Sequence, residues 1–195
     1  MDPINILLAI NLAASLSANA TAAKKDIKQA LIKAEFRPKT YLQKIPPNIA
    51  ALILILQILA VFGIWTLSTQ DFPVLGGFRI AGLAVFIIFS WIQVKAFKSL
   101  GKSYSQEIVI LKEHKLITTG LYKFIRHPQY LAQILSDLGA AFALLGYAIL
   151  PLVILLEIPL FILRAKKEEK LLLKYYGEEY VQYKNRSWFF IPFIA

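Results

Sequence analysis

The sequence of 195 residues contains no cysteine and only two histidines, His114 and His127. Without cysteine, the chain has no disulfide bond, no thiolate nucleophile and no cysteine-ligated metal site. Two histidines alone argue against a dedicated zinc site, so we expect no bound metal. The N-terminus lacks the basic stretch that opens a cleaved signal peptide, and we do not interpret it as one.

Acidic residues are also scarce, because 12 Asp and Glu stand against 22 Lys and Arg, for a net charge of +10. Such a balance can indicate nucleic-acid binding, but the positions of the basic residues favour another explanation. Of the 22, all but Arg79 fall in three segments, residues 24–44, 95–126 and 164–186. If alternate loops face the cytoplasm, this is the positive-inside asymmetry of a membrane protein. We therefore expect a lipid bilayer as partner and no nucleic acid.

Long apolar runs dominate the rest of the sequence. Hydrophobic residues make up 57% of the chain and the mean hydropathy is +0.57, well above the values of soluble proteins. Four or five runs approach the roughly 20 residues that cross a bilayer core of about 30 Å. We predict an all-α integral membrane protein with about five transmembrane helices, at residues 4–23, 49–67, 78–97, 128–150 and 152–163.

This topology places the N-terminus outside and the C-terminus in the cytoplasm, because all three basic segments then lie on one side of the membrane. We expect a single domain, residues 1–195. Residues 1–97 would contain three spans and a basic connector, and residues 98–195 a catalytic region. The last two spans would form a C-terminal helical hairpin with a pocket at its cytoplasmic end.

Two carboxyl groups, Asp137 and Glu157, fall inside the last two predicted spans, where ionisable groups are costly. Each is ten residues from Tyr147, near the turn, so the two should be level in an antiparallel hairpin. We expect them to share a hydrogen-bonded interior, with a structural role favoured over a proton relay or substrate binding. A transporter would also explain buried carboxyl groups, but the sequence lacks the repeated halves typical of such folds.

Proline and glycine mark the ends of the expected hairpin. A residue before proline avoids the helical conformation, so His127 should precede a helix that begins at Pro128. Gly177 should end the last long helix. His127 would then stand beside Arg164 and Glu168, at the cytoplasmic ends of the two spans. Arg164 and Glu168 share a helix face, but an arginine that precedes its glutamate is the weaker orientation for an ion pair, which favours another purpose.

Three motifs in the C-terminal half carry a family resemblance. They are GLYKFIRHPQY at residues 120–130, the acidic pair Glu168-Glu169, and YGEEY at residues 176–180. In this order and at these spacings, residues 107–194 resemble the isoprenylcysteine carboxyl methyltransferase family. A wider group of membrane methyltransferases, which includes phospholipid methyltransferases, shares much of the pattern.

The resemblance implies an enzyme that transfers a methyl group from S-adenosyl-L-methionine at the membrane surface. The acceptor would be a C-terminal prenylcysteine carboxylate or a similar lipidated carboxylate. Arg164 matches the position that meets the substrate carboxylate, and with Glu168 it would be catalytic. By the family's pattern the cofactor would be held by His114, Lys115, Leu116, Ile117, Tyr122, His127, Pro128, Gln129, Tyr130 and Glu168.

The chemistry suits these residue types. A carboxylate is already ionised at neutral pH and needs no general base, so the enzyme supplies alignment and exclusion of water. An arginine can hold the carboxylate by paired hydrogen bonds, and a glutamate can attract the cationic donor. The absence of a glycine-rich dinucleotide-binding motif is consistent with a cofactor site outside the usual soluble fold.

Other functions remain open at this point. A phospholipid N-methyltransferase would use the same donor without a cation to hold a carboxylate. A non-enzymatic transporter or membrane scaffold would bind no donor at all. Reductases that share a related C-terminal fold are a minor further alternative. The sequence leaves the oligomeric state open.

Overall fold

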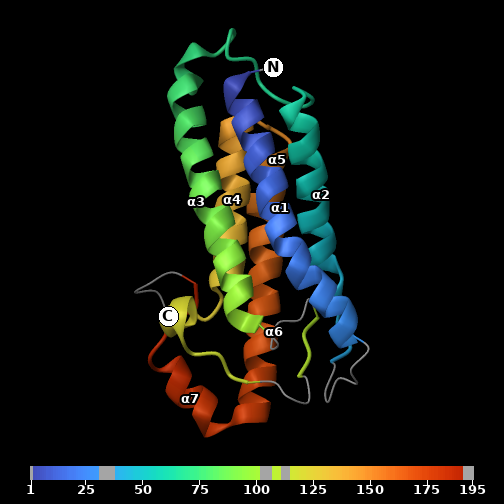
Figure 1. Ribbon diagram of the computed structural model, residues 1–195, viewed down its shortest axis with the longest axis vertical. Helices are drawn as coiled ribbons and strands as arrows, with labels where there is room; N and C mark the ends of the chain where they lie inside the picture. The colour runs from blue at the N-terminus through green and yellow to red at the C-terminus, as the bar shows by residue number, and fades with distance from the viewer. Residues whose placement is uncertain (1, 31–37, 102–106, 111–114, 191–195) are drawn as a thin grey trace.

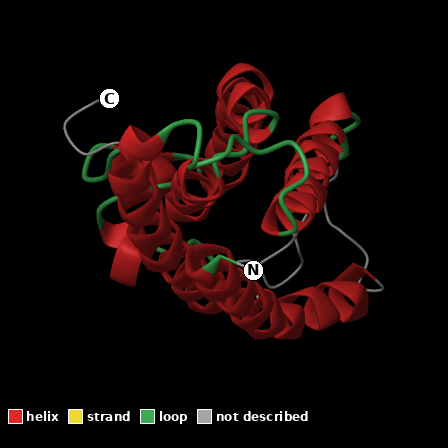
Figure 2. Cartoon of the chain, turned by 90° about the horizontal axis from the view of Figure 1, so that it is seen from above, coloured by secondary structure: helices red, strands yellow, loops and turns green. Residues whose placement is uncertain are grey.

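The protein is a bundle of long helices in the computed structural model, which describes residues 2–30, 38–101, 107–110 and 115–190. Every regular element in these ranges is helical, so the all-α prediction is confirmed. The long helices run along the longest axis of the molecule (Figure 1), and a view along that axis shows them grouped side by side (Figure 2). They are α1 (Pro3–Ala30), α2 (Ile45–Val61), α3 (Gly76–Leu100), α4 (Pro128–Leu144) and α6 (Ile158–Tyr176).

Shorter helical elements connect or extend these five. Three are 3-10 turns: η1 (Tyr41–Gln43), η2 (Pro73–Leu75) and η4 (Gly120–Lys123). The others are α5 (Ile149–Leu152), a π-helical turn η5 (Val153–Glu157) and α7 (Glu178–Lys184).

Three stretches are long and apolar enough to cross a membrane: Pro3–Ala20, Tyr41–Val61 and Pro73–Leu100. Large apolar side chains also point outward from the bundle, among them Ile10, Ile80 and Leu155, which are 62%, 65% and 68% exposed. An exterior of this kind is stable in lipid rather than in water. The expectation of an integral membrane protein is therefore supported by the structure.

Several predicted boundaries differ from the observed helices. Helix α2 ends at Val61, before the expected residue 67, because the chain turns at Gly63, whose φ of +81° suits glycine. Helix α4 ends at Leu144 rather than at residue 150, with Leu145 in the left-handed conformation as its C-cap. Helix α1 continues to Ala30, past the expected residue 23 and into the predicted basic connector. Hydropathy marked the apolar runs but not where the backbone turns.

The start of α4 and the end of α6 lie where the sequence predicted them. Helix α4 begins at Pro128 with His127 just outside it, and α6 ends at Gly177, which has a φ of +53°. The π turn η5 lies immediately before α6, which has Pro159 as its second residue. Proline has no N–H to donate to the carbonyl four residues earlier, and a π turn is one way in which a helix accommodates that loss.

Helices α3 and α4 pack at very close range through two glycines. A Cβ atom at Gly82 would lie 2.6 Å from the backbone nitrogen of Ala143, and one at Gly139 would lie 2.5 Å from that of Phe86. Real Cβ atoms do not approach so closely, so each position requires glycine. Small residues of this kind let membrane helices approach one another. This contact fixes α4, which carries the start of the candidate site.

The two carboxyl groups of the hairpin are both buried in the bundle. Asp137 and Glu157 are 4% and 0% exposed. Asp137 accepts hydrogen bonds from Gln57 at 2.7 Å and from Gln133 at 2.6 Å. These contacts join α2 to α4 in the middle of the bundle, whereas the Glu157 carboxyl oxygens of η5 have no hydrogen-bond partner among the described residues.

The described parts of the three basic segments lie at one end of the bundle, the lower end in Figure 1, and the N-terminus lies at the other. Arg79, the basic residue outside those segments, lies near the N-terminus. Its guanidinium group donates two hydrogen bonds to the Asp2 carboxylate, at 2.8 and 2.9 Å, and others to Asn5 Oδ1 and the Ala143 carbonyl. This cluster ties the start of α1 to α3 and α4.

Candidate active site

The two segments that carry the motifs meet at the basic end of the bundle. Proline at position 128 fixes the start of α4 and leaves His127 as the last residue before it. Helix α6 continues beyond the bundle and places Glu168 and Glu169 beside that histidine. His127 Nδ1 lies 3.8 Å from Glu168 Oε2, and His127 Nε2 lies 3.5 Å from Glu169 Oε1. The predicted convergence of residues 127 and 168 is therefore observed.

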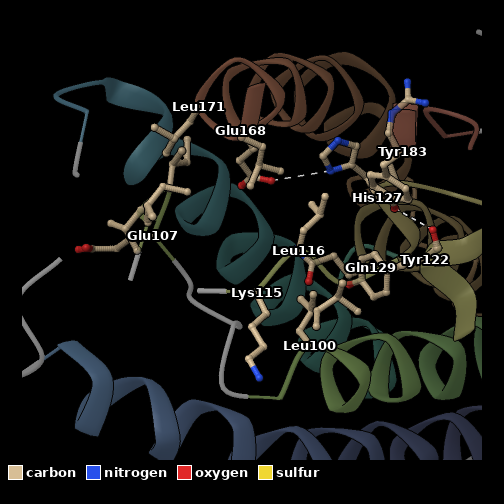
Figure 3. Close-up of a pocket in the computed structure, with 16 residues that line it drawn as sticks. Leu100, Glu107, Lys115, Leu116, Tyr122, His127, Gln129, Glu168, Leu171 and Tyr183 are labelled. Carbon is tan, nitrogen blue, oxygen red and sulfur yellow. Dashed lines mark hydrogen bonds and ion pairs between the residues drawn. The ribbon is translucent and has the colours of Figure 1, made fainter. Parts of the chain in front are cut away.

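A pocket opens at this meeting point (Figure 3). Its cavity volume is about 120 Å³. Seven of the residues expected to hold a cofactor line it: Lys115, Leu116, Ile117, Tyr122, His127, Gln129 and Glu168. Pro128 and Tyr130 lie next to these residues, on the first turn of α4. His114 lies outside the described residues.

Arg164 is buried behind the pocket rather than in its wall. It is 3% exposed, and its Nε donates to the Tyr130 hydroxyl at 2.8 Å and to Glu168 Oε1 at 3.2 Å. Its Nη1 donates to the Leu42 carbonyl at 3.0 Å, which ties α6 to η1. The Tyr130 hydroxyl also donates to Glu168. One network thus joins the expected catalytic pair to α4, and Glu168 connects it to the pocket.

A second network, which the sequence did not assign to the site, supports His127 from the other side. Arg126 Nε donates to Glu169 Oε1 at 2.5 Å, and its Nη1 donates to the carbonyls of Lys184 and Ser187. The backbone nitrogen of Arg126 donates to the Trp188 carbonyl at 2.8 Å. This contact holds the chain after α7 against the motif loop. Arg126 precedes His127 in the motif, and Glu169 belongs to the acidic pair. These positions were the features of the sequence that could have assigned both residues to the site.

Tyr183 is a further pocket residue that the sequence did not indicate. Its hydroxyl donates to the Tyr122 carbonyl at 2.7 Å, a bond drawn in Figure 3. Burial raises the pKa of Tyr183 to about 12, so the hydroxyl keeps its proton at neutral pH. The residue brings α7 to the pocket, although no motif distinguishes it from the other tyrosines of the C-terminal region.

The site has a fixed negative charge at Glu169. Burial acts to raise its pKa, but the neighbouring His127 side chain and the hydrogen bond from Arg126 outweigh that effect and lower the pKa to about 2. Glu169 therefore stays ionised throughout the physiological range. Its charge compensates Arg126 in a region where both side chains are largely buried, at 11% and 6% exposed.

The pocket residues suit a cationic organic ligand with hydrogen-bond donors. Glu168, 20% exposed at the side chain, can place a carboxylate against a positive charge. Gln129 Oε1 is buried and has no hydrogen-bond partner among the described residues, so it is an acceptor available to an N–H group of a ligand. Leu116 and Ile117 provide an apolar wall. Within the described residues, no group of three or more His, Cys, Asp or Glu could hold a metal ion.

Long apolar helices with a polar pocket at one end of the bundle define a polytopic membrane protein. Residues 82–174 match the model of the isoprenylcysteine carboxyl methyltransferase (ICMT) family. Protein-S-isoprenylcysteine O-methyltransferase of Saccharomyces cerevisiae is 32% identical over 117 residues, which cover 59% of this chain and 49% of that protein. Protein-S-isoprenylcysteine O-methyltransferase B of Arabidopsis thaliana is 29% identical over 115 residues, 58% of each. The resemblance that the motifs indicated is confirmed.

The fold is also that of a solved membrane methyltransferase. A structure of the eukaryotic intramembrane Ras methyltransferase ICMT matches with a TM-score of 0.66 at 22% identity, covering 100% of this chain and 69% of that one. The sequence matches span about half the length of the curated relatives. The structural match, in contrast, covers the whole of this chain and so extends beyond the motifs.

Proposed function

We propose that this protein is an integral membrane methyltransferase that uses S-adenosyl-L-methionine to methylate a lipidated carboxylate, such as that of a C-terminal prenylcysteine. The observation that carries the proposal is the buried Arg164, which bonds to Glu168 and Tyr130 beside a pocket lined by the family motifs. Arg164 would supply the positive group that a carboxylate acceptor needs, and Glu168 the negative group that attracts a cationic donor.

The pocket residues fit the donor. When bound, S-adenosyl-L-methionine supplies a methyl group on a positively charged sulfur. Glu168 would attract its cationic part, and Gln129 Oε1 would accept a hydrogen bond from one of its N–H groups. Lys115, Leu116, Ile117, Tyr122 and His127 would surround it, with Pro128 and Tyr130 behind them.

Arg164 would hold the acceptor carboxylate. The carboxylate is ionised at neutral pH and is itself the nucleophile, so no residue has to remove a proton. Tyr130 and Glu168 fix the guanidinium group on two sides, which restricts its rotation before the acceptor arrives. Burial strengthens the attraction between Arg164 and a carboxylate and keeps water from the reacting atoms.

The same proposal includes a topology. We infer five crossings, formed by α1, α2, α3, α4 and the stretch from α5 into α6, with the N-terminus outside and the site in the cytoplasm. The gathering of the described basic residues at the site end of the bundle supports this orientation. The soluble donor would reach the pocket from the cytoplasm, and the lipidated acceptor would reach it from the bilayer.

Methyl transfer in detergent tests the proposal directly. The purified chain is given labelled S-adenosyl-L-methionine with a farnesylcysteine analogue or, in parallel, with phosphatidylethanolamine. We expect transfer to the farnesylcysteine carboxylate. We expect Arg164→Ala to reduce kcat/KM by about thirtyfold or more, because truncation of one partner of a buried charge pair costs about 2–5 kcal/mol.

Arg186→Ala is the matched control, because Arg186 is an exposed arginine at the same end of the bundle, and it should leave the rate unchanged. Transfer to phosphatidylethanolamine that survives Arg164→Ala would assign amine methylation instead. Failure to bind the donor in calorimetry would exclude any methyltransferase.

A further inference from the structure

A second pocket lies on another face of α6. Its wall includes Leu163, Lys166, Lys167, Lys170 and Leu173, which recur every three or four residues and so form one face of the helix. The candidate active site uses Glu168, Leu171 and Leu172 instead. We call the second pocket the lysine groove. Its cavity volume is about 490 Å³, larger than that of the active-site pocket.

The lysine groove is strongly basic. Lys184 of α7 and Arg126 of the motif loop add to the three lysines of α6, so five cations line it. The carboxylate in its wall is Glu169, which already accepts a hydrogen bond from Arg126 and lies 3.9 Å from Lys184 Nζ. One carboxylate balances one cation at most, and the excess positive charge favours an anionic ligand.

The groove also lies where the apolar surface of α6 ends. Leu163 is 45% exposed and closes the apolar run of the helix, and Lys166 follows less than one turn later. Leu156 is 40% exposed and lies seven residues before Leu163, in the π turn η5. An anion bound at the lysines would therefore have an apolar surface directly beside it, leading into the bundle's membrane-facing side.

We propose that the lysine groove binds the phosphate headgroup of an anionic phospholipid, with an acyl chain along Leu163 and Leu156. Basic pockets at the cytoplasmic side of membrane helices are suited to such headgroups, and each nearby lysine adds about 1 kcal/mol of attraction. An acidic peptide would match the charge of the groove but would leave the adjoining apolar surface uncovered. The phospholipid matches both.

The groove is coupled to the active site by shared residues. Arg126 and Glu169 line the groove, and the same pair contacts His127 in the active-site pocket. A headgroup at Lys184 and Arg126 would compete with Glu169 for these cations. Lipid binding itself does not depend on the proposed reaction, because it is measured without donor or acceptor.

Native mass spectrometry of the full chain in detergent tests the site. The protein is mixed with equal amounts of dioleoyl phosphatidylglycerol and dioleoyl phosphatidylcholine, and the retained lipids are counted. We expect the wild type to retain phosphatidylglycerol preferentially. The triple variant K166Q/K167Q/K170Q should lose that preference by at least tenfold, because 1 kcal/mol for each lysine corresponds to about fivefold.

Two control variants distinguish binding at the lysine groove from a general effect of positive charge. K39Q/K95Q/K98Q removes three exposed lysines from the same end of the bundle but outside the groove, and should keep the preference. K166R/K167R/K170R keeps the charge and should keep the preference as well. Equal retention of both lipids by the wild type would overturn the proposal, as would equal losses in the two glutamine triples. Displacement of the lipid by polyglutamate but not by micelles of phosphatidylglycerol would assign the groove to an acidic protein partner instead.

Discussion

The bundle contains buried arginines at both ends, and Arg79 and Arg164 differ in what surrounds them. Arg79 is 6% exposed and Arg164 is 3% exposed, so burial alone does not distinguish them. Arg79 pairs with both oxygens of the Asp2 carboxylate and with Asn5 and a backbone carbonyl. Arg164 shares Glu168 with the active-site pocket, and its Nε divides between that carboxylate and a tyrosine.

The two arginines differ in whether the carboxylate that each one binds also faces a pocket. A bidentate pair such as Arg79 with Asp2 has its partner built in, and the N-terminal end of α1 is held as a result. At Arg164, the neighbouring carboxylate also faces a ligand-sized pocket. The charge of Arg79 is therefore balanced within the fold, whereas the carboxylate beside Arg164 also lines a pocket.

The largest effect on stability is expected at the N-terminal end. Arg79→Ala removes the guanidinium donor from the Asp2 carboxylate, Asn5 Oδ1 and the Ala143 carbonyl, and should cost about 2–4 kcal/mol of unfolding free energy. Methyl transfer by the fraction that remains folded should be unchanged. Thermal unfolding in detergent, with activity measured on the same sample, checks both parts. A variant with wild-type stability and lost activity would remove the distinction between the two ends.

Acid should weaken both ends, but through different carboxylates. At Glu169 the folded-state pKa is lowered to about 2 from an ordinary value of 4.5, so its stabilisation is complete above about pH 4.5. It is lost as the pH falls from about 4.5 towards 2, because the unfolded chain takes up the proton first. The Arg79 guanidinium likewise lowers the pKa of Asp2 below its usual 3.8.

Melting temperatures between pH 6 and pH 2.5 sharpen the comparison. Glu169→Gln should flatten the part of the decline that begins near pH 4.5, and Asp2→Asn only the part below about pH 3.8. The double variant should combine the two, since the sites lie at opposite ends of the bundle. A Glu169→Gln profile parallel to that of the wild type would show that this carboxylate is not stabilised by its neighbours.

The sequence predicted the positions of single residues near the pocket better than it predicted the ends of α2 and α4. Pro128 and Gly177 act through local backbone geometry, so the positions of His127 and of the α6 terminus could be inferred from single residues. The convergence of His127 with Glu168 followed from the antiparallel hairpin. The end of α2 could not be inferred, because the residues after Val61 are as apolar as those before it and hydropathy does not change at the turn.

The residues that the sequence missed act through long-range contacts. Arg126 holds the backbone at Lys184 and Ser187, and Tyr183 reaches the Tyr122 carbonyl. These bonds depend on how α7 and the following chain fold back onto the motif loop, and no spacing in the sequence encodes that path. Arg164 was correctly placed beside Glu168, but its burial behind the pocket depends on η1, which supplies the Leu42 carbonyl.

The smallest effect is expected from removal of the Tyr130 hydroxyl. Tyr130→Phe removes the group that bonds both Arg164 and Glu168 and retains the ring, which packs 5.0 Å from that of Phe161. The loss of one hydrogen bond should cost about 1 kcal/mol of stability. A less tightly held guanidinium group should lower kcat/KM for the carboxylate acceptor about tenfold, mainly through kcat, because orientation rather than charge is lost. The measurement is steady-state kinetics at several acceptor concentrations, with Tyr147→Phe at the opposite end of the bundle as the control. A change in stability without a change in kcat would show that Tyr130 has only a structural role, as Asn5 has.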